Sequence, residues 1–128
     1  MSLFKKVDAL VVKVPDIEKG INFYSGKLGL EVLWKKDDTA ALRLGETELV
    51  LSTKLDPETD ILVESVSEVM DLIVANGGEV ILAPEDIPVG KVGVVKDPFG
   101  NVLTLVDLSK GRYDTDVDKN VTRVKPVA

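Results

Sequence analysis

The sequence predicts one α+β domain made of two modules that share an order of elements: a strand, a helix and three further strands (βαβββ). This order occurs twice at a spacing of about 50 residues, and such internal self-similarity dictates an architecture. The segments GLEVL (29–33) and GGEVI (77–81) also form the same joint, each directly after a predicted helix. The chain has 128 residues, enough for one domain with a real core. We expect a single domain at residues 1–108, with module one at about 4–54 and module two at about 58–108.

Module one starts with VDALVVKV (7–14), a short β-branched run that is typical of a strand. Asp16 is suited to cap the next helix and Gly29 to end it, with Phe23 and Tyr24 as an inward aromatic pair. A period of 3.6 residues puts four apolar residues on one face of that helix: Ile17, Ile21, Tyr24 and Leu28. Three short strands are predicted at 30–36, 39–45 and 47–53.

Module two repeats this order, beginning with a strand at 60–66. The helix that follows has Ser65 and Glu68 at capping-box spacing, with Ser67 as an alternative cap, and it ends at NGG (76–78). Its predicted buried stripe contains Val66, Val69, Met70 and Ile73. Strands are then predicted at 79–84, 91–97 and 101–108. The last strand starts from the turn DPFG (97–100), and it alternates Leu103 and Leu105 on one face with Val102, Thr104 and Val106 on the other.

The segment from 109 to 128 is polar and has no sustained period, so we expect an extended C-terminal arm or a tail. Asp114, Asp116 and Asp118 resemble the opening of a calcium loop. Lys119 occupies the required glycine position, however, and Lys125 the closing glutamate position. The sequence therefore does not predict a calcium site here.

Composition excludes several classes of site. With no histidine and no cysteine, the usual zinc sites, the two-histidine iron triad and the serine–histidine and cysteine–histidine nucleophiles are ruled out. A net charge of −6 disfavours nucleic-acid binding. The same charge suits a cationic small ligand, or it serves only solubility. We expect no membrane span and no signal peptide, and the lack of cysteine favours a cytoplasmic protein.

Two βαβββ modules with these joints resemble the vicinal-oxygen-chelate superfamily of glyoxalase I, bleomycin resistance proteins and extradiol dioxygenases. The matching segments are VVKVPDIEKGINFYSGKLGLEVL and NGGEVILAPEDIPVGKVGVVKDPFGNVLTLVDL. The resemblance covers roughly residues 4–108 and implies a pair of glyoxalase/bleomycin-resistance-type half-barrels with a cavity between them. It also implies that EDIPVG (85–90) is a loop over the cavity mouth, either lid-like or a plain connector. Function is less determined than fold, since this scaffold hosts several activities.

Metal enzymes of this superfamily place four ligands in the cavity, two from each module, on the first and last strands. The resemblance puts these positions at Ala9 and at Val50 or Leu51 in module one. In module two it puts them near Glu58, just ahead of the strand, and at Thr104. At most one position retains a ligand, and one carboxylate does not hold a divalent cation against water. We therefore expect no metal, no cofactor and no assigned catalytic residue.

The predicted ligand-binding residues are Trp34, Arg43, Lys13, Val11 and Thr104. Trp34 is either a stacking platform in the cavity or filling for the core or a dimer interface. Arg43 either clamps an anionic ligand group or pairs with Glu48 on the next strand. Lys13, on the Val11 face of the first strand, either enters the cavity or snorkels to solvent.

Two acids near the expected cavity, Glu48 and Glu58, are either general bases or solvated side chains. The leading hypothesis is metal-independent binding or sequestration of a small amphipathic or cationic molecule, similar to the antibiotic-resistance branch, by a homodimer. The alternative is a metal-dependent lyase, isomerase or dioxygenase of the same superfamily that uses carboxylate ligands. A third hypothesis is a stress or regulatory protein whose dimer surface matters more than its pocket.

Overall fold

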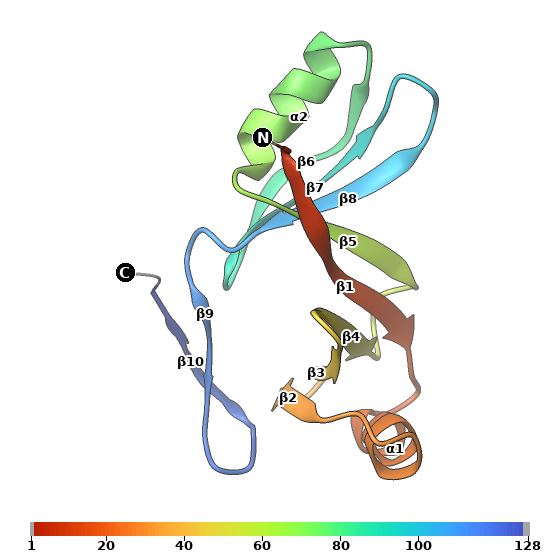
Figure 1. Ribbon diagram of the computed structural model, residues 1–128, viewed down its shortest axis with the longest axis vertical. Helices are drawn as coiled ribbons and strands as arrows, with labels where there is room; N and C mark the ends of the chain where they lie inside the picture. The colour runs from red at the N-terminus through yellow and green to blue at the C-terminus, as the bar shows by residue number, and fades with distance from the viewer. Residues whose placement is uncertain (1, 127–128) are drawn as a thin grey trace. The chain divides into compact units, whose positions relative to one another are not determined.

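The computed structural model describes residues 2–126, which fold into two compact units. One unit contains residues 9–59 and 113–123. The other contains residues 60–112 with the described parts of 1–8 and 124–128. The chain is mostly strands with two helical segments, so the predicted α+β class is confirmed (Figure 1).

Module one contains a four-stranded sheet in the order β2-β3-β4-β1. Its neighbours pair antiparallel except β1 and β4, which run parallel. Its elements are β1 (Phe4–Lys13), α1 (Ile17–Ile21), the π-helical η1 (Asn22–Lys27), β2 (Val32–Lys35), β3 (Thr39–Leu44) and β4 (Thr47–Ser52).

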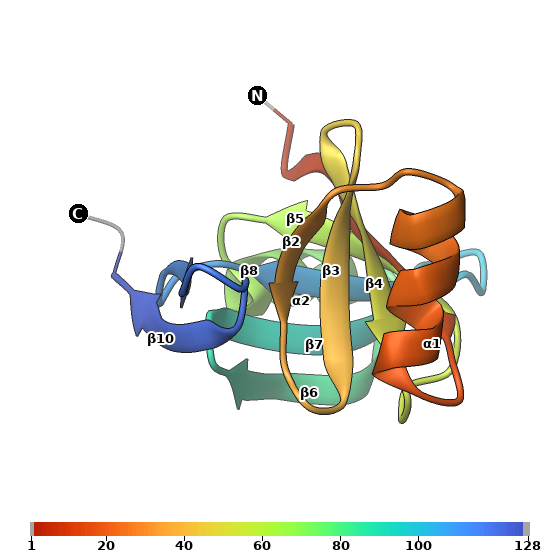
Figure 2. The same cartoon turned by 90° about the horizontal axis from the view of Figure 1, so that it is seen from below.

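Module two repeats this arrangement with the order β6-β7-β8-β5, and again its first and last strands, β5 and β8, run parallel. Figure 2 shows β8, β7 and β6 side by side. The elements are β5 (Glu58–Val63), α2 (Val66–Ala75), β6 (Glu79–Ile87), β7 (Gly90–Lys96) and β8 (Val102–Asp107). The internal duplication predicted from the sequence is therefore confirmed at the level of strand order.

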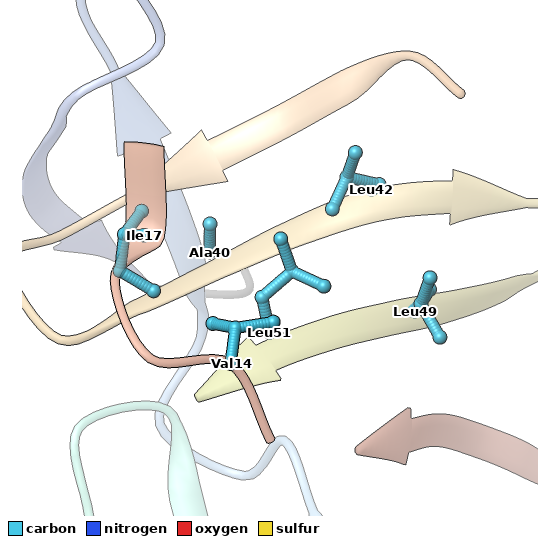
Figure 3. Packing of buried hydrophobic residues seen from close by; sticks show 6 residues of the cluster. All are labelled: Val14, Ile17, Ala40, Leu42, Leu49 and Leu51. Carbon is cyan, nitrogen blue, oxygen red and sulfur yellow. The ribbon is translucent and has the colours of Figure 1, made fainter. Parts of the chain in front are cut away.

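Each module buries its own hydrophobic cluster between helix and sheet. The cluster of module one contains Val14, Ile17, Ala40, Leu42, Leu49 and Leu51 (Figure 3). Gly20 lets α1 approach β4 closely, because a Cβ there would lie 2.9 Å from Leu51 Cδ1. The cluster of module two contains Val63, Val66, Val69, Met70, Val95 and Leu105, with Ile73 and Leu103 packed against it. The predicted stripe of α2 and the inward face of β8 are thus confirmed.

The helix of module one departs from its predicted form. Asp16 caps it as expected, accepting the Lys19 N–H at 2.9 Å. From Asn22 the helix widens to π geometry, and the Leu28 N–H bonds to the Phe23 carbonyl five residues back. The wider turn breaks the 3.6-residue period, so Leu28 and Phe23 are exposed and their prediction as inward residues was wrong. Tyr24 does pack against the core.

In module two, Ser65 is the N-cap of α2, since its Oγ accepts the Glu68 N–H at 3.2 Å. Asn76 caps the other end of the helix, and Gly77 follows with a φ of 104°. The segment 85–90 is not the loop we expected. Strand β6 continues to Ile87, because after a register shift Glu85, Asp86 and Ile87 still pair with the first residues of β7. Only a tight turn is left between the two strands.

The region after residue 108, expected as an arm or tail, contains a two-stranded sheet of β9 (Arg112–Thr115) and β10 (Val121–Lys125). Asp116 closes the connecting loop by accepting the backbone N–H groups of Asp118 and Asn120. Within residues 2–126, no three histidine, cysteine or acidic residues are grouped so that they could hold a metal ion. No helix in that range is long and apolar enough to cross a membrane.

Candidate functional site

The sheet of module one has a second face, opposite the helix, where the predicted site residues of this module lie together. Strand register places Trp34 opposite Ala41, Ala41 opposite Val50, and Val50 opposite Val11. These four side chains form a row across all four strands, since directly paired residues point to the same side of a sheet. The row combines one large aromatic ring with three small apolar side chains.

Polar residues flank this apolar row on the same face. Arg43 pairs in register with Glu48, which in turn pairs with Ala9. The Arg43 guanidinium forms an ion pair with Glu31, with Nε 3.0 Å from Oε1. On the other side of the row, the Lys13 ammonium lies 3.3 Å from Asp56 Oδ1 and is half exposed. Both cations are therefore engaged by surface carboxylates, one on each side of the row.

The register of β4, open from the sequence alone, follows from this pairing. Val50 lies beside Val11 on the face opposite the helix, whereas Leu51 is buried in the core cluster under α1. Of the two candidates, Val50 is thus the one on the face of Ala9, the face that also carries Glu48. The two positions where the resemblance puts metal ligands in module one, Ala9 on the first strand and Val50 on the last, therefore both carry hydrocarbon side chains.

In module two, the parallel pairing of β5 and β8 places Asp60 directly opposite Thr104. Asp60 is half-buried and its Oδ1 is a buried atom, so this side chain is not fully solvated. Glu58 lies within β5 rather than ahead of it. The carboxylate opposite Thr104 is therefore Asp60, a residue that sequence reasoning missed. Its position two residues before Leu62, on the face away from Val63, was the available signal.

The donors at these positions do not fit the metal that the resemblance implies. Ala9 and Val50 offer no ligand atom, and module two offers one carboxylate, Asp60, and one hydroxyl, Thr104. A hard cation in a protein takes six or more oxygen ligands, and a zinc or iron site needs imidazole or thiolate ligands that this chain lacks. No catalytic step through a metal follows from this donor set.

Trp34 has a neighbour that sequence reasoning also missed. The ring of Tyr113, on β9, packs against it with 4.7 Å between centroids and 62° between planes. The edge of β2 reaches the C-terminal hairpin through a parallel bridge from Lys35 to Asn120. This contact was hard to predict, because Tyr113 lies among polar residues about 80 positions away in the chain.

A groove of about 830 Å³ opens beside these residues, at the end of β2. That volume is in the range of small-molecule sites in proteins. Its walls are mostly polar and come from the start of α1, the end of β2, the end of β4 and the hairpin. They are Pro15, Asp16, Ile17, Glu18, Lys35, Lys36, Asp37, Thr53, Asn120 and Val121.

The most deeply buried acid of module two, Asp107, has a structural role. Burial acts to raise its pKa, but hydrogen bonds from Val66, Ser109 and Lys91 outweigh burial and hold the pKa below its usual value. Its carboxylate therefore stays ionised while it ties the end of β8 to the start of α2. This acid is satisfied by the fold and is not a candidate base.

Comparison with known proteins agrees with this architecture. Residues 6–105 match the family model described as Glyoxalase/Bleomycin resistance protein/Dioxygenase superfamily. No curated protein matches the chain at a significant level.

Two solved structures illustrate the likeness. Methylmalonyl-CoA epimerase from Mycobacterium tuberculosis superposes with a TM-score of 0.67 at 15% identity, covering 84% of this chain and 90% of that one. A hypothetical protein from Bacillus halodurans C-125 superposes with a TM-score of 0.66 at 20% identity, covering 85% and 98%. At such identities the likeness concerns the fold alone.

Proposed function

Because the chain belongs to the Glyoxalase/Bleomycin resistance protein/Dioxygenase superfamily, we propose that it binds a small amphipathic or cationic molecule without a metal. The observation that carries the proposal is the pair of hydrocarbon side chains, Ala9 and Val50, at the two positions of module one where metal enzymes of the superfamily have ligands. A binding protein needs a shaped, partly apolar surface with a few polar groups and no reactive centre. The row from Trp34 to Val11, flanked by Arg43 and Lys13, has this character within module one. Thr104 is a further predicted ligand-binding residue, considered by itself in module two.

A second function is a metal-dependent lyase, isomerase or dioxygenase of the same superfamily. Two observations favour it: several similar solved structures are methylmalonyl-CoA epimerases, and Asp60 lies opposite Thr104 in β5 and β8. In that case Asp60 and Thr104 would be two of the ligands. A homodimer in the cytoplasm is part of the first proposal, and the absence of cysteine supports the location.

Metal analysis separates the two functions. Protein produced with manganese, iron, nickel, cobalt and zinc supplied is expected to contain far less than one metal ion per chain. A stoichiometric metal that is lost in Asp60→Asn would overturn the proposal and favour the enzyme. An apo protein that also fails to bind any member of a small-molecule library, followed by Trp34 fluorescence, would contradict the binding function and favour the third hypothesis, a protein whose dimer surface matters more than its pocket.

A further inference from the structure

The side chain of Lys36 lies against an aromatic ring of the C-terminal hairpin. The Lys36 ammonium lies 4.3 Å from the centroid of the Tyr113 ring and 2.7 Å from its hydroxyl oxygen. The Trp34 ring packs against the same tyrosine at 62°. A nearby ammonium is attracted by the negative face of an aromatic ring, and proteins use such contacts to recognise organic ammonium groups.

The hairpin holds Tyr113 in this position. The Lys35 N–H donates to the Lys119 carbonyl at 2.9 Å, and Lys35 bridges to Asn120. Across the hairpin, the Arg123 guanidinium pairs with Asp114 at 2.8 Å, next to Tyr113 in the sequence. These contacts hold the tyrosine ring in place before any ligand binds. Little conformational entropy is therefore lost from the site on binding.

Lys36 also lines the groove at the end of β2. The net charge of the groove lining is negative, which favours binding of one more cation. The groove is lined by three carboxylates, Asp16, Glu18 and Asp37, against two ammonium groups, Lys35 and Lys36. Lys35 lies 3.9 Å from Glu18 and balances that acid. The Lys36 stem is long and flexible, so its ammonium can leave the ring for solvent at a small cost.

We propose that the Tyr113 ring, against which Trp34 packs, is a binding site for the ammonium group of an organic cation, and that Lys36 fills this site in the free protein. The ligand's ammonium takes the place of the Lys36 ammonium over Tyr113, and the rest of the ligand lies in the groove beside Asp37. This inference rests on the proposed binding function and narrows it to one ligand class. Lys36 competes with the ligand and thereby sets the affinity.

Choline and its uncharged carbon analogue, 3,3-dimethyl-1-butanol, are a matched pair of probes. Each is titrated into chelator-treated full-length protein while the fluorescence of Trp34, the single tryptophan, is followed. Choline is expected to bind saturably and at least about fivefold more tightly than the analogue, as a cation–π contact requires. Equal binding of the two probes, or none of either, would overturn the proposal.

Variants test the two roles separately. Lys36→Met keeps the stem and removes the charge, so choline is expected to bind about tenfold more tightly. Lys96→Met, with the same charge change in module two, is the matched control and should leave the affinity unchanged. Tyr113→Phe keeps the ring and should retain choline binding, whereas Tyr113→Leu should abolish it. Unfolding curves of both tyrosine variants show whether the hairpin stays folded.

Failure of this inference is distinct from failure of the proposed function. If Lys36→Met binds choline no more tightly than the natural sequence, Lys36 does not compete and the inference is wrong. The proposed function would stand if the library screen instead found an amphipathic ligand that has no ammonium group. A stoichiometric metal would overturn the proposed function whatever the choline titration gave.

Discussion

The carboxylate of Asp107, at the end of β8, accepts the backbone N–H of Val66, the first residue of α2, with 2.9 Å between Oδ2 and N. Its other oxygen accepts the N–H groups of Lys91 and Ser109 and the Ser109 hydroxyl. Asp107 is 2% exposed. One buried side chain therefore ties the start of the helix, strand β7 and the end of β8 together.

Asp107→Asn is expected to destabilise the protein by about 2 to 3 kcal/mol, the usual cost of losing a charge-assisted bond and leaving a buried group unsatisfied. Asparagine has the same shape, but its amide would place a donor against the Val66 N–H. Urea denaturation followed by circular dichroism measures the change. Asp118→Asn, on the exposed hairpin loop, is the control and should shift the free energy of unfolding by less than about 0.5 kcal/mol.

Acid should weaken the protein through the same residue. Because the pKa of Asp107 is lower in the folded state, its stabilisation is complete above the unfolded pKa of about 3.9 and is lost as pH falls through the folded value. Between about pH 6 and pH 2, the free energy of unfolding should therefore fall less steeply with decreasing pH for Asp107→Asn than for the natural sequence. Denaturation curves recorded at several pH values measure this slope.

Some acid sensitivity should remain in that variant. Hydrogen bonds from Lys110 and Lys91 lower the pKa of Asp86 to about 2. Identical slopes for the two proteins would show that folding does not lower the pKa of Asp107.

Two loops have the same hydrogen-bond pattern, and substitutions at their left-handed residues should change the stability of the protein in opposite directions. Asp97 accepts the N–H of Asn101, and Asp116 accepts that of Asn120. The residue before each asparagine is left-handed, with a φ of 93° at Gly100 and 70° at Lys119. Only glycine adopts this region without strain, which costs other residues about 1 to 2 kcal/mol.

Gly100→Ala should therefore destabilise the protein by about 1 kcal/mol, since a Cβ there meets no atom within 4 Å and the cost is conformational. Lys119→Gly should stabilise it by roughly 0.5 kcal/mol, after the entropy that glycine adds to the unfolded chain is subtracted. Thermal unfolding of both variants checks the signs. Destabilisation by Lys119→Gly would show that Lys119 makes a contact worth more than its strain.

The effect on stability of substituting Gly93, on β7, is expected to depend on the side chain of Met70 in α2. A Cβ at Gly93 would collide with Met70 Sδ and lie 3.0 Å from Val66 Cγ1. Gly93→Ala should cost about 1 to 3 kcal/mol through overpacking, and Met70→Ala about 2 to 5 kcal/mol through a cavity. In the double variant the new methyl enters the space of the lost side chain. A double-mutant cycle should then give a total smaller than the sum, whereas strict additivity would contradict the predicted contact.

Features encoded within a few residues were predictable from the sequence. The repeated βαβββ order, the Asp16 and Ser65 caps, the buried stripe of α2 and the alternation of β8 all depend on local periodicity and on hydrogen bonds between near neighbours. The π-helical turn after Ile21 was not predicted, because the 3.6-residue pattern describes regular helix only. The strands β9 and β10 were missed because their residues are polar and lack alternation.

The sequence by itself determined the two-module architecture, the cores of both modules and the absence of the residue types that most metal and nucleophile sites require. Only the tertiary structure decided that Val50 rather than Leu51 lies beside Val11, that Asp60 lies opposite Thr104, and that Tyr113 packs on Trp34. The physical reason is range. Caps and turns are settled by neighbours in the chain, whereas strand register and hairpin docking are settled by packing between residues 40 to 80 positions apart.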